Sequence, residues 1–352
     1  MDSSNTTLIL TGTGFLQTSV VSFNNNSLQT MYVSAQQLTA ILPAADETAV
    51  GTFSVTVTNP PPGGGVSSAQ QIAIVASPQP MSTARVAIVV LENKPYSEIV
   101  GNTVAPYMNQ LAQQFGLATQ YFANTHPSIG NYFMMTTGQI ITNDDTFTGT
   151  VTDDNLAREI TASGKQWKVY AQALPSVGYT GGDQYPYLRH HNPFSYFSDV
   201  LNSSAQANQI VPFTQFATDL SSGTLPDLLF IIPDAQHDGH DCPVGMSTCT
   251  DNDEIAASDT WLQQNIAPLL ASGAFQNGVL VVTFDESADT DTQNGGGHIA
   301  TIVAGTPVNS GFQSATLMQH QNLLRFVCDR LGLGTCPGEG ASAASAMNAF
   351  LR

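Results

Sequence analysis

The strongest constraint on the fold of this chain is a set of continuous apolar runs that begins at residue 86. The runs cover residues 86–91, 228–232, 278–284 and 299–303. An apolar run without polar alternation is typical of a strand that is buried on both faces of a sheet. Amphipathic stretches that predict helices cover residues 104–115, 260–270 and 319–331. We therefore expect an α/β layered fold with helices on both faces of a central sheet.

The first 75 residues follow a different pattern. Short alternating segments, such as residues 53–58 and 71–75, are separated by Gly, Asn and Pro turns. This pattern predicts a small all-β sandwich. Residues 59–65 (NPPPGGG) are expected to form a hairpin-like loop, because a strand-like run follows them. A short, stiff connector at residues 76–80 is expected to separate a sandwich of residues 1–79 from a second domain of residues 80–352.

The predicted sandwich carries a resemblance to a known module. The segments that carry it are Gly12-Thr-Gly-Phe15, Thr30-Met-Tyr-Val-Ser34, Gln37-Leu-Thr-Ala40, Pro43 and Val57-Thr-Asn-Pro60. Together they are similar to an IPT/TIG immunoglobulin-like domain. Such modules are typically binding or spacer units, so the resemblance leaves room for an extracellular ligand of this domain. No catalytic constellation is present in this region.

The charge of the chain limits its partners. The 352 residues carry a formal net charge of −18 and only nine Lys and Arg. Nucleic acid is excluded as a partner, because phosphate backbones require a basic surface. An anionic substrate would have to be attracted by a local cation rather than by the overall field. No run reaches the ~18 apolar residues of a membrane span, so we expect no transmembrane segment.

Four cysteines occur as two close pairs, Cys242 with Cys249 and Cys328 with Cys336. Metal thiolates are the competing interpretation, but the spacings are not the two-residue knuckles of zinc sites, so we favour two local disulfides. Low lysine and abundant Ser, Thr, Asn and Gly also fit an exported protein. The sequence begins MDSSNTT without a leader pattern, so we expect a secreted or periplasmic protein whose signal peptide has been removed.

Acids and histidines concentrate where predicted strands end. The sequence DAQHDGHD, from Asp234 to Asp241, follows one apolar run directly. The other polar residues at run boundaries are Glu92, Asn93, Asp285, Glu286 and His298. Active sites of α/β sheets collect at the carboxyl ends of strands, and clustered acids and histidines hold cations or move protons. An enzyme is therefore the leading interpretation.

A candidate nucleophile lies in the segment His126-Pro-Ser-Ile-Gly-Asn-Tyr132. An apolar, helix-compatible stretch follows, so the hydroxyl of Ser128 could lie at a helix N-terminus, where backbone amides favour an attacking alkoxide and an incoming phosphoryl oxygen. An ordinary N-cap serine is the alternative. A serine hydroxyl is a poor nucleophile at neutral pH, and a divalent cation is a direct way to activate it.

The second domain resembles a known enzyme family. The motifs that carry the resemblance are Glu92-Asn93, the segment from His126 to Tyr132 with Thr137-Gly138, His191-Asn-Pro-Phe194, His237-Asp-Gly-His-Asp-Cys242 and Phe284-Asp-Glu286. In this order they are similar to the secreted bacterial phosphoesterases, a family of acid phosphatases and phospholipases C within the alkaline phosphatase superfamily. The resemblance spans residues 84–335. It implies a three-layer alkaline-phosphatase-like sheet.

The resemblance also implies roles for single residues. Ser128 would be the nucleophile that takes the phosphoryl group. A divalent metal ion of unknown identity would be held by Glu92, Asn93, Ser128, Asp285 and Glu286. Asn131 would bond a phosphate oxygen, with Asn93 and His126 also near the substrate. The wall facing the leaving group would contain His191, Asp238, His240, Asp241 and His126.

Within that wall, His240 is our choice for the group that protonates the leaving oxygen or orients water, because the neighbouring Asp241 would fix its tautomer. A simple metal-ligand role for His240 is the alternative. A second metal ion would take its ligands from Asp234, Asp238 and His298. The family commonly has Pro where Gly130 stands and often Asn where Asp234 and His237 stand, and these differences could admit another metal.

These observations predict a secreted phosphomonoesterase with an acidic optimum that acts through a phosphoseryl intermediate. Its substrate would be a small phosphate ester or a phospholipid headgroup. A phospholipase C or other phosphodiesterase is the first alternative and would need an apolar groove, for which the candidates are Phe122, Tyr132, Phe133, Phe194, Tyr196 and Phe197. The second alternative function is that of a non-catalytic secreted binding or adhesion protein.

Two further features are expected to be structural. His320 precedes a predicted helix and is interpreted as a cap or packing residue. The tract from Asp289 to Asp291 lacks the twelve-residue pattern of a calcium loop and is interpreted as a solvated loop.

Overall fold

The computed structural model of the chain describes residues 5–43, 46, 51–74 and 84–352. The chain divides into two compact units, Met1–Met81 and Ser82–Arg352. The connector expected at residues 76–80, and with it the expected boundary between residues 79 and 80, lies outside the described residues.

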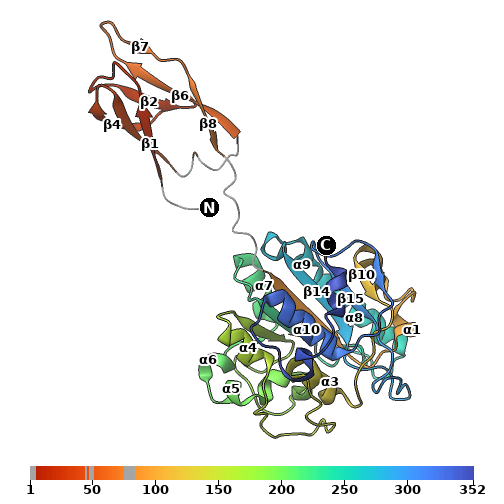
Figure 1. Cartoon of the computed structure of the whole chain (residues 1–352). Helices are drawn as coiled ribbons and strands as arrows, with labels where there is room; N and C mark the ends of the chain where they lie inside the picture. The colour runs from red at the N-terminus through yellow and green to blue at the C-terminus, as the bar shows by residue number, and fades with distance from the viewer. Residues whose placement is uncertain (1–4, 44–45, 47–50, 75–83) are drawn as a thin grey trace. The chain divides into compact units, whose positions relative to one another are not determined.

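The first unit is a β-sandwich (Figure 1). Its strands are β1 (Thr6–Thr11), β2 (Val20–Phe23), β3 (Asn26–Ser27), β4 (Gln29–Ser34), β5 (Gln37–Leu42), β6 (Gly51–Asn59), β7 (Gly65–Val66) and β8 (Gln70–Ile74). One sheet has the order β1-β5-β4, and the other has the order β3-β2-β6-β7 with β8 also paired to β6. Leu38 and Ala40 of β5 pack with Val21 of β2 and Val55 of β6 in one core. The alternation in the sequence thus separates a core face from a solvent face.

The second unit is built on one mixed sheet. Its strands are β9 (Arg85–Leu91), β10 (Gly116–Ala118), β11 (Trp167–Ala171), β12 (Ile210–Pro212), β13 (Leu228–Ile232), β14 (Gly278–Phe284), β15 (Thr301–Ala304) and β16 (Phe312–Ser314). Their order is β12-β11-β13-β9-β14-β15-β10-β16. Strand β9 lies between β13 and β14 and is parallel to both. Three of the apolar runs are therefore adjacent central strands, and their carboxyl ends meet at one edge of the sheet.

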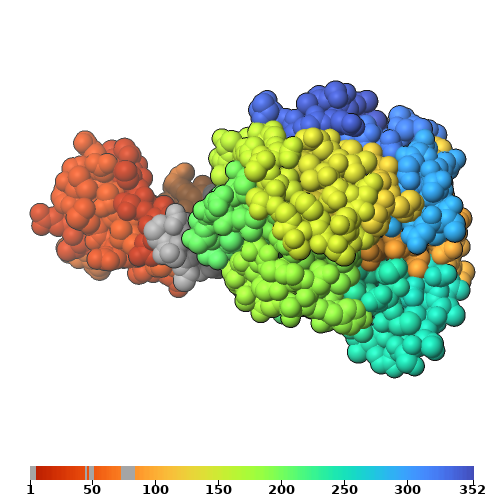
Figure 2. Space-filling view, turned by 90° about the horizontal axis from the view of Figure 1, so that it is seen from below, coloured from red at the N-terminus to blue at the C-terminus, as the bar shows by residue number. Residues whose placement is uncertain are grey.

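Helices cover both faces of this sheet, as the complete burial of β13 and β14 requires. They are α1 (Tyr96–Ile99), α2 (Pro106–Gln114), α3 (Ser128–Thr137), α4 (Leu156–Ala162), α5 (Ser198–Leu201), α6 (Ser204–Ala207), α7 (Thr214–Ser222), α8 (Asp251–Asn265), α9 (Ala267–Ala271) and α10 (His320–Leu331). Helix α3 packs on α10 (Figure 1), and α2 packs on α8. Figure 2 shows the segment from α4 to α7 as a continuous green surface of this unit.

Asp259 of α8 joins two of these helices. Its carboxylate accepts hydrogen bonds from the backbone N–H groups of Tyr107 (3.0 Å) and Met108 (2.7 Å) in the first turn of α2. The N-cap position of α2 is Ala105, which offers no side-chain acceptor. The carboxylate from α8 therefore satisfies amides that a local cap would otherwise serve, a contribution of about 0.5–2 kcal/mol to stability.

Both predicted disulfides are present. Cys242 is bonded to Cys249, and Cys328 is bonded to Cys336. The short strands β10, β11, β12 and β16 were not predicted, since runs of three to five residues carry little periodicity. None of the helices that the structure describes combines the length and hydropathy of a membrane span.

Candidate active site

The site is built where β9, β13 and β14 end. Glu92 and Asn93 follow β9, and Asp285 follows β14. Backbone hydrogen bonds hold the three loops together: the N–H of Glu92 donates to the carbonyl of Asp238 (2.9 Å), and the N–H of Asp285 donates to the carbonyl of Leu91 (2.9 Å). The acids are thus placed by the sheet itself, which makes their positions rigid.

Ser128 is the first residue of α3 and lies within this group of acids. Its hydroxyl donates a hydrogen bond to Oε1 of Glu92 at 2.9 Å, and only 3 % of the residue is exposed. The N–H of Ile129, in the first turn, donates to Asp145 at 3.0 Å. The oxygen therefore lies at the positive end of the dipole of a ten-residue helix. The sequence predicted this position at a helix N-terminus for the hydroxyl of Ser128.

His191 completes a buried ion pair with Glu92. Its Nε2 lies 2.7 Å from Oε1 of Glu92, and its Nδ1 lies 3.7 Å from Oδ2 of Asp238. Burial alone would raise the pKa of Glu92, but the neighbouring imidazole lowers that pKa to about 2. Burial alone would likewise lower the pKa of His191, but Glu92 raises it to about 10. The pair is therefore charged across the physiological pH range.

The other carboxyl groups of the cluster are crowded. Burial and then the charge of Glu92 raise the pKa of Asp285 to about 8. Burial and then the charge of Asp285 raise the pKa of Glu286 to about 10. The pKa of Asp238 is also raised well above its usual range by burial and by Glu92. Such a cluster requires protons or a cation to offset its charge.

The same cluster contains buried oxygens that lack a hydrogen-bond partner among the described residues. They are Glu92 Oε2, Asn93 Oδ1, Asp238 Oδ2 and Asp285 Oδ2. Buried polar atoms are normally paired, so unpaired acceptors at one place require an explanation. Carboxylate and amide oxygens are the donors that hard divalent cations take. The residues present therefore fit a divalent metal ion.

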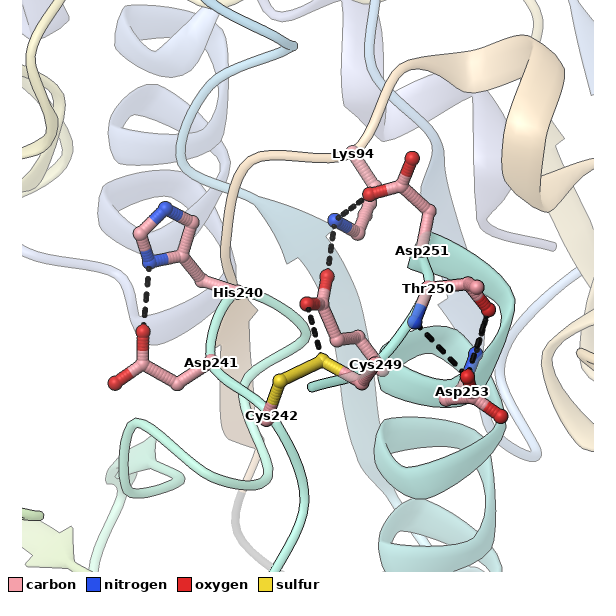
Figure 3. Close-up of a disulfide and its surroundings, with 9 residues drawn as sticks. Lys94, His240, Asp241, Cys242, Cys249, Thr250, Asp251 and Asp253 are labelled. Carbon is pink, nitrogen blue, oxygen red and sulfur yellow. Dashed lines mark hydrogen bonds and ion pairs between the residues drawn. A yellow bond between two sulfur atoms is a disulfide. The ribbon is translucent and has the colours of Figure 1, made fainter. Parts of the chain in front are cut away.

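His240 lies at the solvent side of the cluster. Its Nδ1 is 3.4 Å from Oδ1 of Asp241 and 3.9 Å from Oε2 of Glu92, and 49 % of its side chain is exposed. Figure 3 shows the His240–Asp241 pair beside the Cys242–Cys249 disulfide. The predicted pairing with a neighbouring acid is thus present, and the ring can reach both solvent and the buried acids.

Lys94 and α8 hold the loop that carries His240. Lys94 is 4 % exposed, and its Nζ lies 2.8 Å from Glu254 and 3.0 Å from Asp251 at the start of α8 (Figure 3). Glu254 also contacts the sulfur of Cys249. The buried lysine therefore spans from the end of β9 to the disulfide loop. Lys94 was not predicted as a residue of the site, although its position directly after two candidate ligands was a signal.

The structure gives Asn131 a different set of contacts from the expected one. Its Oδ1 accepts the N–H groups of Asn124 (2.9 Å) and Thr125 (3.2 Å). Its Nδ2 donates to the carbonyl of Thr125 (2.8 Å) and to Glu286 (3.3 Å). Both amide hydrogens are thus engaged, and Asn131 braces the loop before Ser128. To reach a phosphate oxygen it would have to release Glu286.

The expected second-metal residues do not converge. Asp234 Oδ1 lies 2.6 Å from His237 Nδ1, and Gln172 contacts both residues, so these side chains form a separate group. His298 stacks between Tyr96 and Phe122, with ring centroids 4.4 and 4.8 Å away, and its Nε2 contacts the carbonyl of Thr119. Of the three candidates, only Asp238 has its side chain in the cluster around Glu92.

His320 contacts the backbone of the candidate ligand Asp285. Its ring is fully buried, and its Nε2 donates to the backbone carbonyl of Asp285 at 2.7 Å. The expectation of a packing residue was right about burial, but it missed this contact with a candidate ligand. The contact between Tyr132 and His191 was missed as well: the two rings stack with centroids 5.1 Å apart. Neither contact could be read from spacing, because each joins residues far apart in the chain or on unpredicted loops.

Comparison with known proteins agrees with this geometry. The model of the Phosphoesterase family matches residues 101–334, and that of the IPT/TIG domain matches residues 2–74. The chain belongs to the phosphoesterase family. It is therefore a hydrolase that acts on phosphoric esters, with a first unit that matches the IPT/TIG domain.

Two curated relatives illustrate the similarity within this phosphoesterase family. Phosphatidylinositol-3-phosphatase of Mycobacterium tuberculosis (strain H37Rv) is 32% identical over 261 residues, which cover 74% of this chain and 80% of the relative. An acid phosphatase of Aspergillus fumigatus is 29% identical over 256 residues, which cover 69% of this chain and 54% of the relative. The chain thus spans about half the length of that fungal relative.

Solved structures show the same fold at low identity. A protein of the alkaline phosphatase superfamily from Vibrio parahaemolyticus has a TM-score of 0.52 at 12% identity, covering 71% of this chain and 67% of its own. A lipoteichoic acid synthase from Listeria monocytogenes has a TM-score of 0.51 at 12% identity, covering 75% of each chain. The phosphoesterase unit therefore has the alkaline-phosphatase-like architecture that the sequence predicted.

Proposed function

We propose that this phosphoesterase is a secreted, metal-dependent phosphomonoesterase that acts through a phosphoserine at Ser128. One observation carries the proposal. The hydroxyl of Ser128 lies 2.9 Å from Glu92 at a helix N-terminus, beside buried carboxylate oxygens that have no hydrogen-bond partner among the described residues. A nucleophile, a cation site and an anion-favouring helix end thus coincide.

Glu92, Asn93, Ser128 and Asp285 would hold the metal ion, with Glu286 next to them. Glu92 cannot be the base that activates Ser128, because its pKa of about 2 makes it too weak. When bound, a divalent cation lowers the pKa of a coordinated hydroxyl and neutralises charge on the phosphoryl group. With only nine Lys and Arg in the chain, few other groups could do this.

The residues of the chain supply the remaining steps. The hydroxyl of Ser128 loses its proton to solvent, its oxygen attacks phosphorus, and the bond between phosphorus and the leaving oxygen breaks. His240 gives its proton to that oxygen, since it is the exposed histidine of the cluster. Water then attacks the phosphoserine and gives a proton to His240. The bond between phosphorus and the Ser128 oxygen breaks, and inorganic phosphate and free Ser128 result. His191 is a positioning residue in this scheme, because it is buried and holds Glu92.

We expect the highest turnover at acidic pH, in line with the similarity to acid phosphatases. Secretion is supported by the two disulfides, because these bonds persist in oxidising compartments. The first unit would then act as a spacer or bind an extracellular ligand.

The burial of the aromatic residues favours a monoesterase over a phospholipase C. The six candidates for an apolar groove are all at most 3 % exposed, so they belong to the core. A substrate whose phosphate projects from a soluble or lipid-borne headgroup fits better, and the similarity to a phosphatidylinositol-3-phosphatase is in line with such a substrate. The intact cluster around Ser128 argues against a purely binding protein.

The test compares p-nitrophenyl phosphate with bis(p-nitrophenyl) phosphate and phosphatidylcholine, before and after chelation and metal add-back. We expect the monoester to be hydrolysed at least about 100-fold faster (kcat/KM) than either diester, with activity lost on chelation and restored by metal. Faster diester hydrolysis would favour a phosphodiesterase instead. Full monoesterase activity in the chelated protein would refute metal dependence.

A further inference from the structure

A second group of potential ligands lies beside the Ser128–Glu92 cluster. It consists of His126, Glu286 and Asp289, each of which offers a ligand atom within 4.8 Å of the others. His126 comes from the loop before α3, whereas Glu286 and Asp289 come from the loop after β14. Only Glu286 is shared with the ligands proposed for the first metal ion.

The two ring nitrogens of His126 have different surroundings. Its Nε2 lies 3.0 Å from the backbone carbonyl of Asp291, and a carbonyl can only accept, so Nε2 carries the hydrogen. The other ring nitrogen, Nδ1, is buried. It lies 3.3 Å from Oε2 of Glu286 and has no hydrogen-bond partner among the described residues. The buried nitrogen and the carboxyl oxygen thus face each other without a hydrogen bond.

Glu286 is buried among other acids. Its side chain is 1 % exposed, and the groups that act most strongly on it are the acids Asp285, Glu92, Asp145 and Asp289. Asn131 donates one neutral hydrogen bond to Oε2. His126 also has the geometry of a metal ligand, because a ligating histidine usually donates its other N–H to a carbonyl or carboxylate.

We propose that His126 Nδ1, Glu286 and Asp289 bind a second divalent cation, separate from the one at Glu92 and Asp285. One imidazole nitrogen and two carboxylates suit ions such as Mn²⁺ or Zn²⁺ better than Mg²⁺ or Ca²⁺, which prefer oxygen ligands alone. This ion would link the loop after β14 to His126, which lies two residues before Ser128. Its role is to position the nucleophile, so the inference goes beyond the proposed reaction.

The test counts bound Mn²⁺ by equilibrium dialysis and electron paramagnetic resonance in the full chain, the Asp289→Asn variant and the Glu339→Gln control. Asp289 and Glu339 are both exposed, and each change removes one negative charge without altering shape. We expect two ions per chain for the wild type and the control. The variant should bind the second ion at least about 100-fold more weakly, since lost supporting contacts alone cost 10–100-fold in affinity.

Pulsed electron paramagnetic resonance gives an independent readout. The ligands proposed for the first ion are all oxygens, so coupling of Mn²⁺ to an imidazole nitrogen reports the second ion alone. This coupling should be present in the wild type and absent from His126→Gln. Equal ion counts and affinities in wild type and Asp289→Asn, or a wild type without nitrogen coupling, would overturn the second site. Neither result would affect the proposed reaction, which depends on the ion that Asp285 holds.

Discussion

Replacing Ser128 with Ala should lower kcat for p-nitrophenyl phosphate by at least about 10⁴-fold, because the variant has no oxygen that can form the phosphoserine. The change removes one hydroxyl that donates to Glu92 and leaves the Glu92–His191 pair in place. We therefore expect the unfolding midpoint to stay close to that of the wild type.

The matched control for this variant is Ser258→Ala, which removes the hydroxyl of another buried serine. Ser258 lies in α8 and, within the described part of the chain, donates to the carbonyl of Ile255, so its loss should change kcat by less than about two-fold. Rapid quench with ³²P-labelled substrate should also trap labelled wild-type protein and no labelled Ser128→Ala. Undiminished turnover in Ser128→Ala would mean that water attacks the phosphate directly or that another residue is the nucleophile.

The Asp285→Asn variant should lose metal binding while its metal-free form becomes no less stable. The pKa of Asp285 is raised to about 8 by burial and by Glu92, above the ordinary value of 3.8. The folded metal-free protein thus binds this proton more tightly than the unfolded chain. Its free energy of unfolding falls as the pH rises from about 4 to 8. Asparagine carries no charge, so the variant should lose less stability across this pH range.

Added metal should stabilise the wild type more than the Asp285→Asn variant. A ligand at 100 times its Kd stabilises a folded protein by about 2.7 kcal/mol, so the wild type should melt at a higher temperature with Mn²⁺. At the same concentration Asp285→Asn should show less than half of this gain. Asp259→Asn is the control, since it removes a buried carboxylate outside the site and should keep the full gain. An equal metal-induced shift in Asp285→Asn would exclude Asp285 as a ligand.

The central sheet and its acids were predictable from the sequence for a physical reason. Strands buried on both faces must be apolar throughout, so their ends are marked by the first polar residue, here Glu92 and Asp285. Parallel neighbours end at the same edge, which brings these side chains together. The order of the strands was not predictable, because apolar runs carry no information about which run pairs with which.

The orientation of the His298 side chain could not be predicted from the sequence. His298 precedes β15, which runs antiparallel to β14, so it does begin at the expected edge. Its ring is nevertheless held between Tyr96 and Phe122, a contact of aromatic faces that sequence spacing does not encode. His191 was expected near the substrate from family resemblance alone. Its pairing with Glu92 depends on the irregular loop around residues 189–196, which has no periodic pattern.

The most direct test of the account is a crystal structure of the Mn²⁺-loaded protein with anomalous diffraction data. We predict an anomalous peak within about 2.0–2.6 Å of Ser128 Oγ, one oxygen of Glu92 and one oxygen of Asp285. A well-ordered protein that binds Mn²⁺ elsewhere and shows no peak among these three oxygens would contradict it.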